Sequence, residues 1–465
     1  MSDAAALARI VKAYDVRGLV EDELTPTIAR ALGTAAALVL GTPGAPFVVG
    51  RDMRPSSPAL VAAFSDGLLD AGIDVLDVGL VSTDAVTYAS GAFGAPGAMF
   101  TASHNPAPYN GIKFCAAGAV PVSIDSGLAR IRDVAVAVLE GGQDAVPGSV
   151  AATRGVRSER DLLPQFAAHV RGFVTDRSAL QGMRVVVDAG NGMAGLVWPA
   201  VTDGLGLDTI PLFFTLDGTF PNHPADPLDP ENLTDLSARV VETNAVLGLA
   251  FDGDADRVFA VDAAGHPMDS SLVGALVATR ILEREPGGTV LHNLICSRSV
   301  PEAILAAGGR PVRTRVGHSF IKAEMARTGA VLGIEHSGHF YFRDNARADS
   351  GVIAALMLLE AVAAGGGSLS DAVAPHATRF RSGERNVRVS DADAALARVR
   401  AAYAEHPTDM LDGLTVDLGS VWFNLRPSNT EPLLRLNVEA DATEGEQGVD
   451  ATVAAVTGLI ASVEA

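Results

Sequence analysis

The chain has 465 residues, of which 48% are hydrophobic, and its formal net charge is −20. This length suggests roughly two to four domains of about 100–200 residues, with enough apolar material for several cores. The negative charge argues against nucleic acids and anionic membranes as partners but leaves anionic small-molecule substrates open, because local positive charge can oppose the overall field.

The chain carries no predicted signal for membranes or secretion. No run of 18 or more uncharged apolar residues appears, and the first 18 residues lack the apolar block of a signal peptide. The two cysteines, Cys115 and Cys296, lie far apart in apolar surroundings, which does not indicate a disulfide framework. We therefore expect a cytoplasmic protein in a reducing compartment.

Positive charge is supplied almost entirely by arginine. Only three lysines occur, Lys12, Lys113 and Lys322, beside 32 arginines. Because lysine offers a compact point charge where arginine offers a planar fork, each lysine suggests a specific role.

A pattern of apolar strand, polar loop and helix recurs along the chain. Its first unit spans 45–72, with a strand over 47–50 and a helix after Ser56 or Ser57 as its cap, with Pro58 in the first turn. Similar units span 182–201 and 287–309. Strands alternating with helices indicate largely parallel, covered sheets, so we expect three related α/β domains.

Segments rich in glycine, alanine and proline over 141–155 and 363–375, and a turn over 262–269, suggest the boundaries. From about residue 371 the pattern changes to strands typical of an antiparallel α+β fold. The predicted domains are therefore 1–150, 151–262, 263–370 and 371–465.

The segment TASHNP (101–106) follows a short strand and places Ser103 on a loop, with His104 and Lys113 close in sequence. A serine nucleophile or phosphate carrier needs a base or a cation nearby, and Lys113 is a candidate. The alternative is an ordinary turn, because Ser, Asn and Pro are common turn residues.

The segment FDGDADRVF (251–259) alternates Asp252, Asp254 and Asp256. On an extended backbone these side chains share one face, where three carboxylates repel one another unless a cation lies between them. Oxygen-only ligands favour Mg²⁺. An EF-hand would need Gly and Glu where Arg257 and Ala263 stand, so it is excluded. A solvated polar turn remains the alternative.

The segment GIEHSGHF (333–340) gathers Glu335, His336, Ser337 and His339 in one polar loop. Zinc is weakly supported, because no cysteine or third histidine lies near. Hydrogen bonding to sugar hydroxyls, with His339 as acid or base, is more natural. Ordinary loop polarity is the alternative.

The segment RPSNTEPLLRLN (426–437) supplies many hydrogen-bond donors, and guanidinium groups, hydroxyls and backbone amides together suit a phosphate. The alternative is a turn before a strand. The candidate phosphate-binding residues are Arg426, Ser428, Asn429, Thr430 and Arg435.

One further motif points elsewhere. Gly190, Gly192 and Gly195 follow a predicted strand in GxGxxG spacing, and Asp217 lies about 20 residues on, as in dinucleotide-binding proteins. The glycines can instead allow tight strand-to-helix packing. A dinucleotide-dependent oxidoreductase would leave the aspartate triplet and the Ser103 loop unexplained.

Taken in order over essentially the whole chain, the four polar loops resemble those of the α-D-phosphohexomutases, and YDVRG (14–18), with Tyr14 and Arg17, adds a fifth match. The resemblance implies three related α/β domains and a C-terminal α+β domain around a central cleft. It implies Ser103 as the phosphate carrier, a phosphate clamp in the 426–437 loop, and Mg²⁺ held by Asp252, Asp254, Asp256 and Ser103. The catalytic set is then Ser103, His104, Lys113, Arg17 and His339, and the substrate-binding set is Tyr14, Arg257, His318, Glu335, Ser337 and His339.

The chain departs from the family pattern at two places. His336 stands where relatives often have Met or Glu in GEMSGH or GEESGH, and the glucosamine pattern GEQSGH is absent. Some dual-specificity members carry a contacting lysine where Ile295 stands here, and Arg298 and His318, in the same region of the sequence, are the candidates to compensate for it.

The implied activity is that of a bacterial phosphomannomutase, which interconverts mannose 6-phosphate and mannose 1-phosphate through phosphoserine and a hexose 1,6-bisphosphate. In that reaction Arg17, Lys113 and Arg257 would neutralise the transferring phosphoryl group, and Lys113 or His339 would transfer protons. Phosphoglucomutase or dual activity is the alternative, because no motif visibly reads the sugar C2. A non-catalytic sugar-phosphate-binding protein is the remaining possibility.

Overall fold

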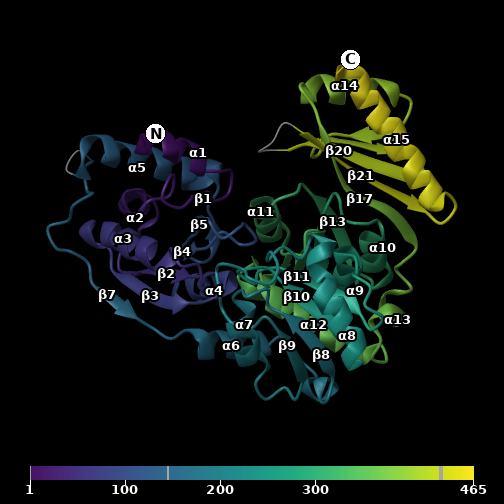
Figure 1. The fold of residues 1–465 in the computed structure, drawn as a ribbon, viewed down its shortest axis with the longest axis horizontal. Helices are drawn as coiled ribbons and strands as arrows, with labels where there is room; N and C mark the ends of the chain where they lie inside the picture. Colours follow the sequence, from purple (N-terminus) through teal and green to yellow (C-terminus); the bar gives the residue numbers. More distant parts are fainter. Residues whose placement is uncertain (1, 144–145, 429–432, 465) are drawn as a thin grey trace.

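The computed structural model describes residues 2–143, 146–428 and 433–464 and contains four sheets in succession along the chain (Figure 1). The predicted order of three α/β units and one antiparallel unit is confirmed. Each of the first three sheets has a parallel centre and antiparallel strands at one edge, so these sheets are mixed rather than purely parallel.

The first sheet has the strand order β1-β5-β4-β2-β3-β7, with β6 beside β5. Strand β7 lies beyond residue 150, so this sheet includes a strand from the range expected for the second domain. The strands are β1 (Val16–Leu19), β2 (Phe47–Arg51), β3 (Val75–Leu80), β4 (Gly97–Phe100), β5 (Tyr109–Ala116), β6 (Val120–Pro121) and β7 (Arg157–Glu159). The accompanying helices are α1 (Asp3–Ile10), α2 (Pro26–Leu40), α3 (Ser57–Asp70), α4 (Thr83–Phe93) and α5 (Ala129–Gly141). Helix α6 (Leu163–Arg171) follows β7 and packs against a helix of the second unit.

The second and third sheets have the orders β11-β10-β8-β9 and β13-β12-β14-β15-β16. The second contains β8 (Arg184–Asp188), β9 (Asp208–Leu212), β10 (Leu247–Phe251) and β11 (Val258–Asp262), with helices α7 (Ala194–Thr202) and α8 (Thr234–Thr243). The third contains β12 (Thr289–Asn293), β13 (Arg310–Thr314), β14 (Leu332–Ile334), β15 (Phe340–Phe342) and β16 (Ala348–Asp349), with helices α9 (Ser270–Leu282), α10 (Ser299–Ala306), α11 (His318–Thr328), α12 (Gly351–Ala364) and α13 (Leu369–Val373).

The fourth sheet is antiparallel throughout, in the order β17-β21-β20-β19-β18. Helices α14 (Ala392–Ala402) and α15 (Gly445–Glu464) accompany it. Its strands are β17 (Arg379–Arg388), β18 (Thr408–Asp409), β19 (Leu414–Asp417), β20 (Val421–Pro427) and β21 (Leu433–Asp441).

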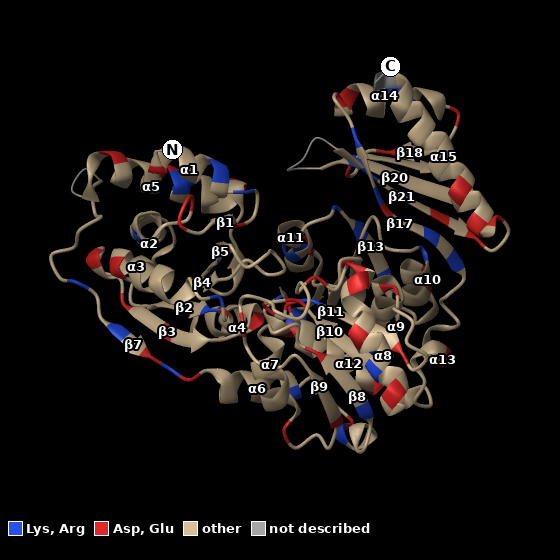
Figure 2. Cartoon of the chain, viewed as in Figure 1, with Lys and Arg blue, Asp and Glu red and all other residues tan. Residues whose placement is uncertain are grey.

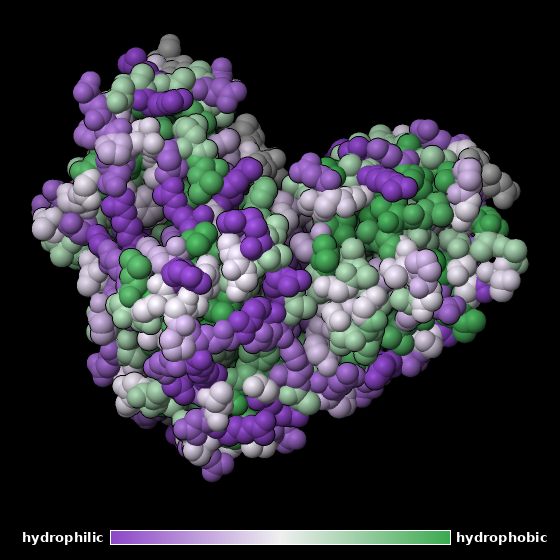
Figure 3. All heavy atoms as spheres, turned by 180° about the vertical axis from the view of Figure 1, so that it is seen from behind, coloured by the Kyte–Doolittle hydropathy of each residue, from purple (hydrophilic) through white to green (hydrophobic). Residues whose placement is uncertain are grey.

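One hydrophobic core extends from one side of the first sheet through the second and third units and includes helix α12. The rest of the first unit and the fourth unit have further cores of their own. The twelve consecutive residues from Gly351 to Val362 are all buried, and all but one of them are apolar or glycine, as expected for a helix inside a core. Seen from behind, the N-terminal and C-terminal units form two lobes with a notch between them (Figure 3).

The predicted serine cap of α3 is not formed. Ser56 stands at the N-cap position without a side-chain cap hydrogen bond. Its hydroxyl accepts a hydrogen bond from Asn110, while the Ser57 hydroxyl donates to Asp52 at 3.0 Å. Both serines therefore connect α3 to the interior of the first sheet.

The polar exception inside α12 is Glu360, a fully buried carboxylate. It accepts hydrogen bonds from the backbone N–H groups of Thr175 and Asp176 at 3.1 and 2.8 Å, and it pairs with Arg280 at 3.2 Å and with Arg284. Glu360 therefore ties the segment that enters the second sheet to the central helix. Burial would raise the pKa of Glu360, but hydrogen bonds from the Thr175 hydroxyl, the Asp176 N–H and Arg284 outweigh it and lower the pKa.

We expect Glu360→Gln to lower the free energy of unfolding by about 1–3 kcal/mol, because a buried charge-assisted network is broken. Because the pKa of Glu360 is lower in the folded than in the unfolded protein, the stabilisation is fully present at pH values above the unfolded pKa of Glu360. It is lost as the pH falls through the folded pKa of this residue. Denaturant unfolding should therefore show a smaller difference in the free energy of unfolding between wild type and Glu360→Gln at pH 4 than at pH 7. The matched control Glu283→Gln removes an exposed partner of Arg280 and should change little. An equal effect of both variants would contradict the assignment.

Candidate active site

A cavity of about 1200 Å³ lies where the four sheets meet. Its walls include residues from the loops after β4, β10 and β14 and from β17 and β20. Acidic and basic residues mix in the loops beside β11 at the centre of the molecule (Figure 2). All three lysines of the chain, Lys12, Lys113 and Lys322, line this one cavity.

Ser103 lies in a tight loop between β4 and β5 and is only 4% exposed. Its φ of 50° is left-handed, a conformation that costs a residue with a side chain about 1–3 kcal/mol. Its hydroxyl donates to Asp252 Oδ2 at 2.7 Å and lies 3.4 Å from Arg257 Nη2. The strained backbone therefore points the hydroxyl across to the loop of the second sheet.

The three predicted aspartates lie together between β10 and β11 and are all buried. One carboxylate oxygen from each lies within 4.8 Å of the others. Asp254 Oδ1 and Asp256 Oδ1 are buried without a hydrogen-bond partner among the described residues. Buried oxygens left unsatisfied in a carboxylate cluster fit a hard divalent cation, so these residues can hold a metal ion.

Lys113, on β5, bridges Asp254 and Asp256 at 2.7 and 2.6 Å. Burial alone would lower the pKa of Lys113, but the carboxylates of Asp254, Asp256 and Asp252 raise it. Burial raises the pKa of Asp252 to about 7 despite the neighbouring Arg257. Burial would also raise the pKa of Asp256, but Lys113 outweighs it and holds that pKa well below its usual value. Lys113 is therefore an ammonium group at neutral pH.

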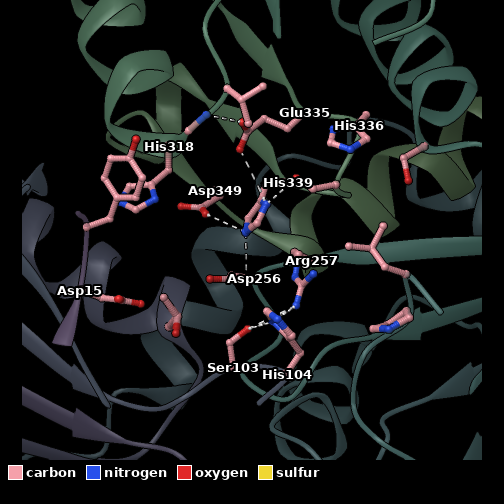
Figure 4. Close-up of a pocket in the computed structure, with 18 of the residues that line it drawn as sticks. Asp15, Ser103, His104, Asp256, Arg257, His318, Glu335, His336, His339 and Asp349 are labelled. Atoms are coloured by element: carbon pink, nitrogen blue, oxygen red, sulfur yellow. Dashed lines mark hydrogen bonds and ion pairs between the residues drawn. The ribbon is translucent and has the colours of Figure 1, made fainter. Parts of the chain in front are cut away.

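Arg257 connects Ser103 and its neighbours to the aspartate loop (Figure 4). It pairs with Asp252 at 2.9 Å and donates to His104 Nδ1 at 2.5 Å. Burial, followed by Arg257 and Arg17, lowers the pKa of His104 to about 2. His104 is therefore a neutral hydrogen-bond acceptor.

The segment that contains Tyr14 and Arg17 forms another wall of the cavity. Arg17 pairs with Asp15 at 2.6 Å and donates to Asn105 of the Ser103 loop. The Tyr14 ring packs edge-on against His318 with centroids 4.9 Å apart. This contact joins the first unit to helix α11 of the third. Burial lowers the pKa of His318 to about 4, so this imidazole is neutral at pH 7.

The loop between β14 and β15 reaches the same cavity. The Glu335 carboxylate accepts hydrogen bonds from the Gly317 N–H at 2.9 Å and from the Tyr341 hydroxyl at 2.7 Å. Ser337 Oγ lies 3.1 Å from His339 Nδ1. His336 also lines the cavity but lies apart from the other labelled residues (Figure 4).

His339 is surrounded by carboxylates, with Asp256 at 3.6 Å, Glu335 at 3.8 Å and Asp349 at 3.9 Å. Burial would lower the pKa of His339, but the nearby carboxylate of Asp256, followed by those of Asp349 and Glu335, raises it. A backbone bridge between Arg257 and His339 holds the aspartate loop against this loop.

At the C-terminal end of the cavity, Arg426 and Arg435 converge on Glu384 at 3.0 and 2.9 Å. The Nε groups of both arginines are buried without a hydrogen-bond partner among the described residues, and Ser428 lines the cavity beside them. The predicted residues Asn429 and Thr430 lie outside the described residues.

The expectation that Arg298 compensates for Ile295 is not supported, whereas His318 lines the cavity. Arg298 pairs with Asp417 at 2.8 Å, stacks over Trp422, and is not among the residues that line the cavity. Ile295 is fully buried, and its carbonyl accepts a hydrogen bond from Arg381 at 2.7 Å.

The glycines of the GxGxxG segment serve packing. A side chain at Gly192 would come within 2.7 Å of the Gly253 carbonyl, and one at Gly195 within 2.2 Å of the Phe214 carbonyl. The Met193 N–H donates to Gly253 at 2.9 Å. Gly192 therefore packs directly against the aspartate loop, and Gly195 packs against the segment that follows β9.

Sequence reasoning missed several residues of the site. Arg54 donates to backbone carbonyls of the Ser103 loop, and Thr83 donates to Asp254 at 2.6 Å. Asp349 pairs with Lys322 at 2.9 Å beside His339. The scarcity of lysine was a signal for Lys322, whereas the other three lie in segments without a distinctive pattern.

Comparisons with known proteins agree with this geometry. Four family models described as phosphoglucomutase/phosphomannomutase match the chain: alpha/beta/alpha domain I over 8–135, domain II over 164–265, domain III over 269–380 and the C-terminal domain over 384–456. No helix in the described part of the chain is long and apolar enough to cross a bilayer.

The chain is 42% identical to a protein named phosphohexose mutases from Xanthomonas campestris pv. campestris, covering 92% of this chain and 94% of that one. It is 37% identical to a phosphomannomutase/phosphoglucomutase of Pseudomonas aeruginosa, covering 94% and 93%. A solved family structure from Burkholderia thailandensis superposes with a TM-score of 0.86 at 29% identity, covering 99% and 98%. The chain therefore belongs to the phosphoglucomutase/phosphomannomutase family and is a phosphohexomutase, an isomerase.

Proposed function

We propose that this phosphohexomutase is a phosphomannomutase, which interconverts mannose 6-phosphate and mannose 1-phosphate. The observation that carries the proposal is the Ser103 hydroxyl, which donates to Asp252 beside Arg257 in a cavity shared by all four sheets. A relative from Salmonella montevideo, 40% identical over 92% of this chain, is named phosphomannomutase. The name of the Pseudomonas aeruginosa relative supports the second candidate, dual activity on mannose and glucose phosphates.

In this proposal Ser103 carries the phosphoryl group between the two half-reactions. Asp252 directs the Ser103 oxygen, and Arg257 lies close enough to neutralise charge on the transferring group. We propose Mg²⁺ as the ion held by Asp252, Asp254 and Asp256, with the phosphorylated Ser103 as a further ligand. When bound, Mg²⁺ would neutralise charge on the phosphoryl oxygens.

Proton transfer at the sugar hydroxyl is assigned to His339 rather than to Lys113. Two carboxylates hold the proton of Lys113, whose raised pKa suits a permanent cation. His339 is partly exposed in the cavity and has three carboxylate neighbours that can stabilise its charged form. His104, Arg17, Tyr14 and His318 would then bind and orient the phosphate and the sugar.

A hexose 1,6-bisphosphate intermediate would rotate within the cavity so that its other phosphate faces Ser103. The volume of about 1200 Å³ exceeds the roughly 300–1,000 Å³ of usual ligand pockets, which leaves room for this rotation.

We propose the ranges 1–150, 151–262, 263–370 and 371–465 as the domains that surround the cavity, with β7 added to the first sheet. Buried, unpaired Cys115 and Cys296 support a cytoplasmic location.

The preferred sugar can be measured with coupled assays on mannose 1-phosphate and glucose 1-phosphate under the same conditions. A specificity constant at least tenfold higher for mannose 1-phosphate supports the proposal, and equal values support dual activity. Failure to convert either sugar would overturn both.

Ser103→Ala should lose most of the mutase flux, because no hydroxyl remains to hold the phosphoryl group. Intact-mass spectrometry after incubation with glucose 1,6-bisphosphate should show one phosphate on the wild type and none on the variant. Phosphate on His104, with full activity of Ser103→Ala, would contradict the assignment.

Asp254→Asn keeps the shape of the side chain but removes one charge from the cluster. We expect a loss of turnover of at least 100-fold with a small change in thermal stability, because a metal ligand is weakened while the contacts with Lys113 and Thr83 persist in part. Calorimetric titration with MgCl₂ should show weaker binding than in the wild type. Full activity of the wild type in excess chelator would exclude a required metal.

Substitutions in the phosphate clamp and in the loop of Glu335 should affect the activity toward different hexose phosphates in different ways. Arg426→Ala should weaken all hexose phosphates alike, by roughly 10- to 150-fold, since a charge-assisted hydrogen bond is worth about 1.5–3 kcal/mol. Glu335→Gln should impair glucose and mannose phosphates nearly equally, because both sugars share the C3 and C4 configuration, and should affect galactose phosphate less. Tyr341→Phe, which frees one oxygen of Glu335, is the matched control and should show a weaker form of the same pattern. If Arg426→Ala changed the sugar preference instead, the two roles would have to be exchanged.

A further inference from the structure

Arg54 is only 1% exposed, and every N–H group of its side chain donates a hydrogen bond within the first unit. Its Nε pairs with Asp52 at 3.2 Å. Its Nη1 donates to the carbonyls of Pro106 and Tyr109, each at 2.9 Å. Its Nη2 donates to the carbonyls of Ser103 at 2.9 Å and Asn105 at 2.7 Å. One guanidinium therefore holds four carbonyls of the loop that presents Ser103.

This guanidinium is fixed on its other sides as well. Asp52 is fully buried and also accepts from the Ser57 hydroxyl at 3.0 Å, which anchors it to helix α3. The Phe220 ring, from the second unit, covers the guanidinium at 5.1 Å. A side chain at Gly218 would come within 2.5 Å of the Arg54 Cα, so the segment around 218–220 lies directly on Arg54. The group has no room to move independently of the loop.

The hydrogen bond between Arg54 and the Ser103 carbonyl connects this guanidinium to the residue that would carry the phosphoryl group. Ser103 has the left-handed φ of 50°, and a strained backbone persists only where its surroundings hold it. The hydrogen bond from Arg54 fixes the peptide plane directly after the Ser103 Cα, while Thr101 Oγ1 accepts from the Ser103 N–H at 2.9 Å. Together these contacts determine the direction of the Ser103 side chain toward Asp252.

We infer that Arg54 is a positioning residue for phosphoryl transfer at Ser103, which keeps the serine oxygen in line with the group it receives and donates. This inference rests on the proposed phosphoserine function. Lysine cannot replace Arg54, because an ammonium has three donors and no planar fork to reach carbonyls on two sides. Arg54 is not among the residues that line the cavity, so its loss should affect turnover rather than binding.

The test compares Arg54→Lys with Arg284→Lys. Arg284 is a control because it holds the buried Glu360 and is not among the residues that line the cavity. We expect Arg54→Lys to lower kcat about 100-fold with KM changed less than threefold, since a displacement of about 1 Å at a reacting group costs about that factor. Phosphorylation of Ser103 by glucose 1,6-bisphosphate, followed by intact mass, should slow by a similar factor. Arg284→Lys should lower the melting temperature but leave kcat and KM within twofold of the wild type.

Hydrogen–deuterium exchange provides a readout that does not depend on activity. Peptides covering 101–110 should exchange faster in Arg54→Lys and remain unchanged in Arg284→Lys. If Arg54→Lys does not fold, Asp52→Asn removes the charge that orients Arg54 and should show the same kcat loss and the same local exchange to a smaller degree.

Three results would overturn the inference: a kcat of Arg54→Lys within threefold of the wild type, a loss that appears in KM instead, or a kcat loss no larger than the unfolded fraction. Failure of the proposed function looks different, because wild-type protein would then take up no phosphate at Ser103.

Discussion

The site is organised around carboxylates that would repel one another if they were left without cations. Asp252, Asp254, Asp256 and Asp349 are buried within one cluster, and Asp256 belongs to two sets of groups close enough to share an ion. At such separations uncompensated like charges cost several kcal/mol even at the intermediate dielectric of a protein site. Lys113, Arg257 and Lys322 supply the balancing charge, each from a different unit of the chain. The cluster therefore requires the first three units to pack in one arrangement.

Helix N-termini strengthen this arrangement. Thr83, the first residue of α4, donates to the Asp254 side chain, and Asp84 accepts from Ser350, the N-cap of α12, at 2.5 Å. The positive ends of both helices thus lie beside the aspartate loop, where they favour negative charge. Gly351 permits this approach, since a side chain there would come within 2.8 Å of the Ala255 carbonyl. One junction of two helices and one loop joins three sheets.

The four polar loops could be predicted from sequence because each combines residues whose chemistry is evident within six to twelve positions. Asp252 and Ser103 are examples, and the structure brings them to 2.7 Å although 149 positions separate them. Arg54 could not be found in this way, because its partners lie about 50 positions further along the chain. The role expected of Arg298 is unsupported for a related reason, since proximity to a motif in the sequence does not specify whether a side chain reaches the cavity. The mixed character of the sheets was also hidden, as a buried antiparallel strand has the same apolar composition as a parallel one.

The placement of all three lysines in one cavity has a practical consequence for chemical labelling. Reagents that acylate primary amines can react in this chain only at the N-terminus and at Lys12, Lys113 and Lys322. Of these, Lys12 is exposed, whereas Lys113 and Lys322 are held by carboxylates. A single amine-directed fluorophore or cross-linker would therefore attach either at Lys12 beside the cavity or at the N-terminal amine. Because lysine is scarce in this chain, amine-directed reagents can place a probe beside the cavity without labelling other lysines on the surface.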